Sequence, residues 1–279
     1  MFNIRYHIAS LVGVFLALAL GLMLGGLVVQ QGTVERQQSA LVDGLRKEFA
    51  QIREDNQSLT AENEALAGFS GQLTDAWAAE RLDGQTVLVV AAAGQEEQVR
   101  AVTRAVEGAG GAVAVATILE PGLAIETSDV RSVLASAGME PVELESVAAS
   151  LAAELGFALQ ERPLVGMLGE AGVLRVEGLS AGTAATGLVD LAAFEGEADS
   201  AGIALSLAYD RIGSAIAVSP GDPGSDLARV ADASDLAAID HLETPLGRFS
   251  LIALLTGAPK GYYGTGERAS ALFPALPTP

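Results

Sequence analysis

Ser180 stands at the centre of Gly178-Leu179-Ser180-Ala181-Gly182, which matches the G-x-S-x-G pattern of serine hydrolases. In those enzymes the serine lies on a sharp turn between a strand and a helix, and an acid and a histidine complete a triad. His241 follows Ser180 in the required order. The next residues, Thr183 to Gly187, lead into strand-like sequence rather than a helix. We therefore expect a glycine-rich loop at Ser180, no catalytic residues and no enzymatic activity.

Two other glycine-rich segments resemble phosphate-binding loops only in part. Ala93-Gly94-Gln95 follows a predicted strand, where a dinucleotide-binding fold would hold a pyrophosphate, but the G-x-G-x-x-G pattern is missing. Residues 257–266 (GAPKGYYGTG) follow a predicted helix and lack the G-K-[ST] ending of a P-loop. Neither segment predicts a nucleotide or another cofactor.

The side chains that bind metals are scarce. The chain has no cysteine, so thiolate metal sites and disulfides are excluded. Met23 lies in an apolar run, while Met139 and Met167 fall in unrelated segments, so no thioether pair has ligand spacing. Asp240-His241 beside Glu243 could hold a hard or borderline ion, but a histidine near a helix cap is the preferred interpretation. The metal ligands, if there are any, remain unknown from the sequence.

Composition limits the partners of the chain. Its 279 residues carry a formal net charge of -19. So acidic a surface repels phosphate backbones and anionic lipid head groups, which argues against nucleic-acid binding. Attachment to a membrane must therefore come from a hydrophobic segment. The length suffices for such a segment, a helical stalk and one globular domain of about 200 residues.

The C-terminal two-thirds has the pattern of a doubly wound α/β domain. Continuous apolar strands separated by amphipathic helices indicate a mostly parallel sheet that is covered on both faces. Thr244 followed by Pro245 predicts the cap and first residue of a helix that ends at Gly257. The other predicted elements are strands at Thr86–Ala93, Ala112–Leu119, Gly187–Ala193, Ser214–Ser219 and Leu236–Asp240, and a helix at Gln95–Glu107.

The N-terminal segment predicts a membrane anchor. Ile8 to Val29 is an apolar run of 22 residues in which Ser10 is the one conventionally polar side chain, and about 20 residues cross a bilayer. The run is longer than a signal-peptide core, and its end at Gly25–Val29 matches a cleavage site poorly. We expect an uncleaved signal-anchor at residues 1–30. Arg5 favours a cytoplasmic N-terminus and an extracytoplasmic head.

A coiled-coil stalk is predicted at residues 31–70. Heptad a and d positions from Val42 to Leu66 hold apolar residues, except for Asn56 and Asn63 at a positions. Leucine at d with occasional asparagine at a favours a parallel two-stranded coil, and hence a homodimer. An amphipathic helix packed on its own globular domain remains the alternative. The glycines at 68, 71 and 84 suggest a linker at about 71–84, and the head domain is assigned to residues 71–279.

Three landmarks resemble the actinobacterial copper transporter family known as MctB. The first is Ile4-Arg5-Tyr6-His7 with the apolar run to Gly26, followed by the coiled coil. The second is the run at 240–247 (DHLETPLG), which opens the last long helix. The third is Gly261-Tyr262-Tyr263-Gly264 near the C-terminus. The resemblance extends over essentially the whole chain, and its two ends carry most of the specificity.

This resemblance implies a role in copper homeostasis or efflux across the cell envelope, with copper as the transported ion. The chain is similar to proteins that are described as channel-forming in an outer membrane. A single apolar helix without a polar face offers no ion pathway of its own. The alternative is therefore a non-enzymatic, dimeric envelope scaffold whose acidic head binds a protein or glycan partner.

Overall fold

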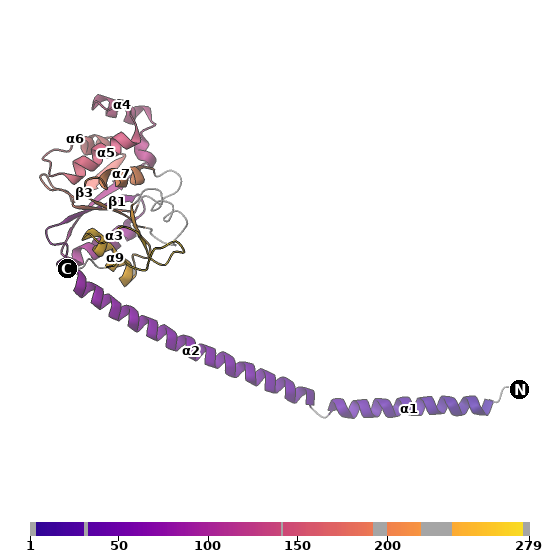
Figure 1. The fold of residues 1–279 in the computed structure, drawn as a ribbon. Helices are drawn as coiled ribbons and strands as arrows, with labels where there is room; N and C mark the ends of the chain where they lie inside the picture. The colour runs from indigo at the N-terminus through magenta and orange to yellow at the C-terminus, as the bar shows by residue number, and fades with distance from the viewer. Residues whose placement is uncertain (1–3, 31–32, 141, 192–199, 219–235, 276–279) are drawn as a thin grey trace. The chain divides into compact units, whose positions relative to one another are not determined.

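The structure is a computed structural model that describes residues 4–30, 33–140, 142–191, 200–218 and 236–275. The chain divides into two compact units, residues 1–65 and 66–279. Figure 1 shows the elements of both. The first unit contains helix α1 (Ile4–Gln30) and most of helix α2 (Thr33–Ala78). The second contains the last turns of α2 and the α/β domain, which we call the head.

Helix α1 has the properties of a membrane span. Residues Arg5–Gly26 form a candidate span of 22 residues with a mean hydropathy of 2.4, and none of its most apolar window is buried within the protein. A helix of this length rises about 33 Å, enough to cross a hydrocarbon core of about 30 Å. The apolar N-terminal helix predicted from the sequence is confirmed.

Helix α2 is longer than predicted. The sequence predicts a stalk that ends at residue 70, followed by a linker, yet α2 runs on to Ala78 through Gly68 and Gly71. Glycine costs about 1 kcal/mol relative to alanine in a helix, but packing of the last turns on the head offsets this cost. Thr74 and Ala78 are buried there, and the Thr74 hydroxyl donates to the Pro245 carbonyl oxygen at 3.3 Å.

The head contains one seven-stranded sheet with the order β3-β2-β1-β4-β5-β6-β7. All neighbouring strands are parallel except β3, which runs antiparallel to β2. The doubly wound, mostly parallel α/β fold predicted from the sequence is therefore confirmed. The strands are β1 (Thr86–Ala92), β2 (Ala112–Ile118), β3 (Leu174–Glu177), β4 (Gly187–Asp190), β5 (Ser214–Val218), β6 (Ala237–Ile239) and β7 (Tyr262–Tyr263).

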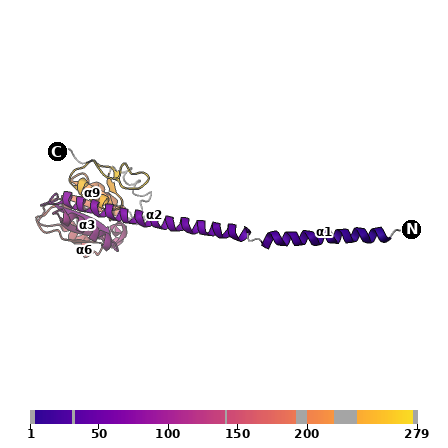
Figure 2. The same ribbon diagram turned by 90° about the horizontal axis from the view of Figure 1, so that it is seen from below.

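Helices cover both faces of this sheet, which is why its central strands are apolar throughout. In β1, Leu88 and Val90 pack into the core of one face, while Val87 and Val89 pack into the core of the other. Figure 2 shows α3, α9 and the last turns of α2 together on one face. That face is covered by α3 (Glu96–Gly108) and α9 (Pro245–Leu255). Five helices cover the other face: η1 (Pro121–Ala124), α4 (Ser128–Ser136), α5 (Leu144–Gly156), α6 (Pro163–Glu170) and α7 (Ser200–Tyr209).

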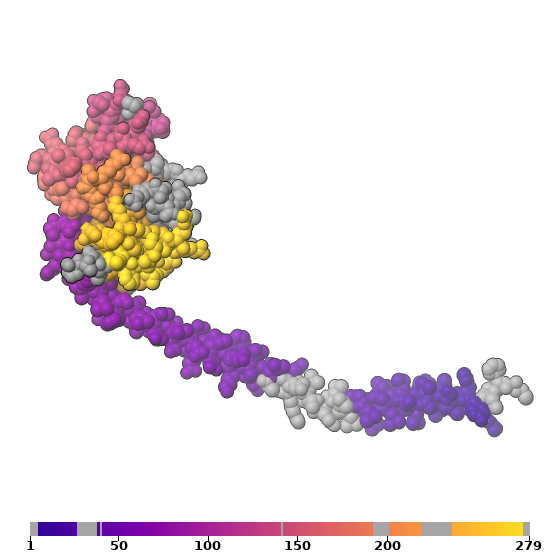
Figure 3. Space-filling view, viewed as in Figure 1, coloured from indigo at the N-terminus to yellow at the C-terminus, as the bar shows by residue number. Residues whose placement is uncertain are grey.

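Strands β3 and β7 were not predicted because both are short and lack a continuous apolar run. In β3, Leu174 is buried while Arg175 and Glu177 are exposed, so the continuous apolar signal of the central strands is missing. The two residues of β7 lie inside the glycine-rich 257–266 segment. In the space-filling view of Figure 3 the C-terminal segment that contains β7 (yellow) lies beside the part of the chain around α7 and β5 (orange).

Candidate functional site

The site begins where β6 ends, at Asp240. The Asp240 backbone N–H donates to the Tyr263 carbonyl oxygen at 3.1 Å, which continues the pairing of β6 with β7. His241 then turns the chain out of the sheet with a φ of 53°, in the left-handed region that non-glycine residues seldom adopt. The first two residues of the 240–247 segment thus lie at the carboxyl end of a parallel strand, where ligands of α/β folds usually bind.

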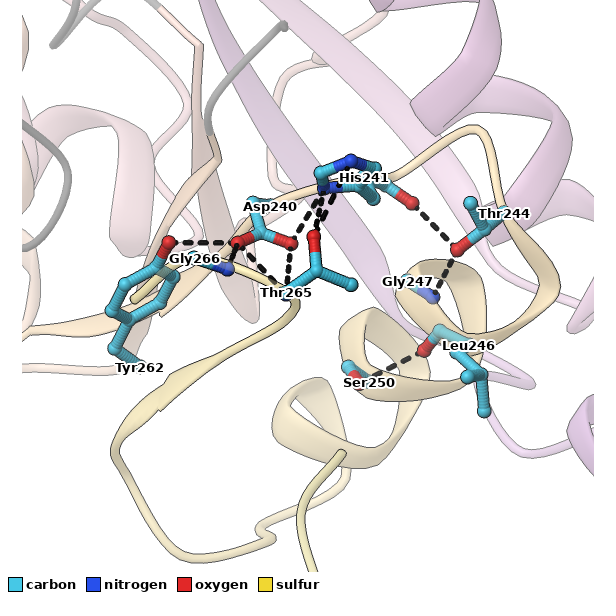
Figure 4. A network of polar contacts seen from close by, with 9 residues as sticks. All are labelled: Asp240, His241, Thr244, Leu246, Gly247, Ser250, Tyr262, Thr265 and Gly266. Carbon is cyan, nitrogen blue, oxygen red and sulfur yellow. Dashed lines mark hydrogen bonds and ion pairs between the residues drawn. The ribbon is translucent and has the colours of Figure 1, made fainter. Parts of the chain in front are cut away.

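The Asp240 carboxylate is fully buried and accepts hydrogen bonds from four residues (Figure 4). Its Oδ2 accepts from the Tyr262 hydroxyl at 2.7 Å and from the Gly266 backbone N–H at 3.0 Å. Its Oδ1 accepts from the Thr265 backbone N–H at 2.9 Å and lies 2.8 Å from His241 Nδ1. We call these five residues the Asp240 network. They join the end of β6 to the 257–266 segment.

These contacts hold the carboxylate in its ionised form. Burial raises the pKa of Asp240, but the hydrogen bonds from Tyr262, from the backbone of Thr265 and Gly266 and from His241 together lower the pKa below its ordinary value of 3.8. Burial and the neighbouring Asp240 charge raise the pKa of Tyr262. The Tyr262 hydroxyl therefore remains a donor at neutral pH. The network is an ionised carboxylate enclosed by donors.

Two glycines make room for this arrangement. Gly264 has a φ of 146°, and a Cβ added there would overlap the Asp240 carboxylate. A Cβ added at Gly247 would overlap the backbone of His241. Thr244 caps α9 by accepting from the Gly247 N–H at 3.1 Å, and its own hydroxyl donates to the His241 carbonyl oxygen at 2.8 Å. The predicted cap at Thr244 is confirmed, and both glycines are required by close packing.

Ser180 and His241 do not form a triad. Ser180 follows β3, at one edge of the sheet, while His241 follows β6, five interstrand steps away. At about 4.8 Å per step, this separation is about 24 Å. Because β3 is antiparallel, Ser180 also lies at the end of the sheet opposite to His241, with Gly178 next to the backbone of Val113. The structure does not assemble a hydrolase site from these residues.

The segment after β1 is closed by the side chain of Gln95, the last residue of the partial phosphate-loop pattern. Gln95 is buried, its Oε1 accepts from the Ala92 N–H at 2.8 Å, and its Nε2 donates to the Leu191 carbonyl oxygen at 3.0 Å. It therefore links the ends of β1 and β4, where the strand order reverses. Glu96 and Glu97 occupy the first turn of α3, where a phosphate would otherwise sit. A glutamine in the short turn between a buried strand and a helix was the available signal.

Among the described residues, the candidate metal ligands do not form a group that could hold an ion. Within the described residues there is no group of three or more histidine, cysteine, aspartate or glutamate side chains that could hold an ion. Asp240 already accepts hydrogen bonds at both oxygens, and the Glu243 side chain is exposed. Met139 and Met167 both pack at the rim of the core covered by α4 to α7, although they come from separate segments. The metal ligands remain unassigned.

Comparison with known proteins gives one result. No curated protein and no solved structure matches the chain. The family described as "Copper transport outer membrane protein, MctB" matches residues 1–274. The match covers the apolar helix, α2, the whole sheet and the Asp240 network. The chain therefore belongs to the MctB copper transport outer membrane protein family.

Proposed function

We propose that this protein is a single-pass envelope protein that supports copper homeostasis or efflux and has no enzymatic activity of its own. The family match over residues 1–274 carries this proposal. Helix α1 supplies the membrane attachment, and Arg5 before it favours a cytoplasmic N-terminus with the head outside. Copper is the substrate of the process, and its ligands are not assigned to this chain.

The Asp240 network supports a structural role for the two C-terminal segments that resemble the MctB family. Both C-terminal landmarks meet in it, because Asp240 and His241 belong to the 240–247 segment and Tyr262 belongs to the other. The Asp240 carboxylate accepts hydrogen bonds from the Tyr262 hydroxyl and from the backbone of Thr265 and Gly266. We infer that these landmarks determine how the head folds, and that the head acts by presenting its surface.

We further propose a parallel homodimer formed through α2. The a and d side chains Val42, Leu45, Phe49, Ile52, Leu59 and Leu66 are 44–62% exposed in the single chain. A row of apolar side chains on one face of a helix is stable in water only when another surface covers it. Asn56 and Asn63 at a positions would pair in register, and Glu48 at g would lie near Arg53 at e of the partner helix. A second copy of the chain meets all of these requirements.

The alternative is a dimeric scaffold whose head binds a protein or glycan partner without handling copper. The exposed a and d side chains of α2 support this alternative as well. They account for dimerisation whether or not the protein handles copper. The two functions differ in one respect. Loss of a copper protein changes how cells respond to copper, whereas loss of a general scaffold changes growth whether or not copper is added.

Deletion of the gene followed by a growth test separates these functions. Growth is measured over a series of copper concentrations, with zinc as the control metal, for the parent, the deletion strain and complemented strains. We expect sensitivity to copper alone, restored by the full chain and equally by Ser180→Ala. Parental growth in copper would contradict the copper function. A defect of the same size without added metal would favour the scaffold.

A further inference from the structure

The heptad pattern of α2 continues beyond Leu66 into the turns that belong to the head. Counted on from that d position, Phe69 is a g residue, Leu73 is the next d residue and Trp77 is an a residue. All four lie in the same compact unit as the head, and α2 remains helical to Ala78. The side chains of Leu66, Phe69 and Leu73 are 54–60% exposed. The last turns of α2 thus carry an apolar face that the described part of the chain leaves uncovered.

The head packs on a different side of these turns. Thr74, at an e position, is buried and donates to the Pro245 carbonyl oxygen at 3.3 Å. Ala78, at a b position, is also buried, and Asp75, at an f position, lies 4.0 Å from Arg248. At about 100° per residue, these three positions of α2 centre roughly 130° away from the two d leucines. Packing on the head therefore leaves the a, d and g side of α2 available to another surface.

Aromatic rings connect this apolar face of α2 to the head. The centroid of the Trp77 ring lies 4.4 Å from that of Phe249, and the centroid of the Phe249 ring lies 5.8 Å from that of Phe273. Phe273 is exposed. Leu246 is exposed as well, and it lies on the same side of α9 as Phe249 because the two residues are three positions apart. The apolar surface thus passes from α2 onto α9 and the C-terminal segment.

A second copy of the chain fits this surface, because the surface continues the a and d row of α2 in register. In a parallel two-stranded coil, a g residue lies beside the e residue five positions later in the partner helix. Phe69 would then lie beside Thr74 of the partner subunit, close to the exposed Leu246 of that subunit's head. We propose that each head docks on the helix of the other chain through Phe69, while the two Leu73 side chains pair across the axis. This inference rests on the proposed α2 dimer and adds the heads to its interface.

Cross-linking between two differently tagged copies of the full chain tests this contact, because the chain has no native cysteine. One copy carries Phe69→Cys and the other carries Leu246→Cys, so a short bismaleimide reagent can join the two tags only across the interface. We expect a mixed cross-linked dimer when both copies are produced in the same membranes. In the control, Arg131→Cys replaces Leu246→Cys. Arg131 is exposed on α4, on the other face of the sheet, and should give no mixed dimer.

The strength of the dimer gives a second measurement, made by sedimentation equilibrium of the full chain in detergent. Phe69→Ala should raise the dissociation constant of the dimer about tenfold, because aromatic residues carry much of the binding energy of an interface. Gln72→Ala, at an exposed c position, is the matched control and should leave the dissociation constant unchanged.

The outcomes separate the docked heads from the dimer itself. If Leu59→Cys cross-links and the mixed pair does not, the docking of the heads is overturned and the α2 dimer stands. An unchanged dissociation constant for Phe69→Ala would overturn the docking too. If Leu59→Cys gives no dimer either, the proposed coil fails and the docking of the heads fails with it.

Discussion

The Tyr262 hydroxyl donates a 2.7 Å hydrogen bond to Oδ2 of Asp240, although the two residues lie 22 positions apart in the chain. This contact joins the two C-terminal segments that resemble the MctB family. Because the carboxylate is buried and ionised, each donor around it contributes to the stability of the head.

Asp240→Ala should lower the free energy of unfolding of the head by about 3–5 kcal/mol, because the Tyr262 hydroxyl and two backbone N–H groups lose their acceptor. Chemical denaturation monitored by circular dichroism measures this change. Asp210→Ala is the matched control. It removes an ion pair with Lys260 that is partly exposed, and should cost about 1 kcal/mol or less. Equal losses in the two variants would contradict the account of the network.

The stability of the head should depend on pH through Asp240. Because its pKa is lowered in the folded state, its contribution is complete above the unfolded value of 3.8 and is lost as the pH falls below that value. Denaturation curves of the wild type and Asp240→Asn, taken between about pH 5 and pH 2, should converge as the pH falls. A constant difference between the two proteins over this range would show that the carboxylate is not held ionised.

Gly264→Ala should be more destabilising than Gly84→Ala. Both glycines have positive φ, 71° at Gly84 and 146° at Gly264, so each substitution introduces backbone strain of about 1–3 kcal/mol. A Cβ at Gly84 meets no atom within 4 Å, whereas a Cβ at Gly264 would collide with the Asp240 carboxylate. Thermal unfolding of the two variants provides the comparison. Similar melting temperatures would indicate that the close approach to Asp240 does not constrain the fold.

Cysteine cross-linking can test the parallel dimer, because the chain has no native cysteine. Leu59→Cys and Leu66→Cys place thiols at d positions, and each variant should form disulfide-linked dimers under mild oxidation in membranes. Ala61→Cys, at an f position on the outer side of the coil, should remain monomeric on a non-reducing gel. Efficient cross-linking of Ala61→Cys, or none at either d position, would rule out this register.

The sequence predicted the elements that are long or apolar on both faces. β1 and β2 follow from their continuous apolar runs, and the start of α9 follows from Thr244 and Pro245. Strands β3 and β7 lack the continuous apolar run from which β1 and β2 were predicted. Residues of β3 are exposed, and β7 is only two residues long. The extension of α2 was missed because tertiary packing, rather than local propensity, keeps glycines in that helix.

The candidate site was predictable only in its parts. Asp240 and His241 were recognised as neighbours in the sequence, and Tyr262 and Gly264 as part of another motif. Nothing local shows that one carboxylate collects donors from both segments, because these contacts form only when β6 and β7 pair. Gln95 illustrates the same limit, since its partner Leu191 lies 96 residues away.

We propose that this protein of the MctB family takes part in copper homeostasis. Cell copper content, measured by mass spectrometry after growth in added copper, tests the claim most directly. The account predicts more copper per cell in the deletion strain than in the parent, and a return to the parental value when the full chain is supplied. Equal copper contents in the deletion strain and its parent would contradict it.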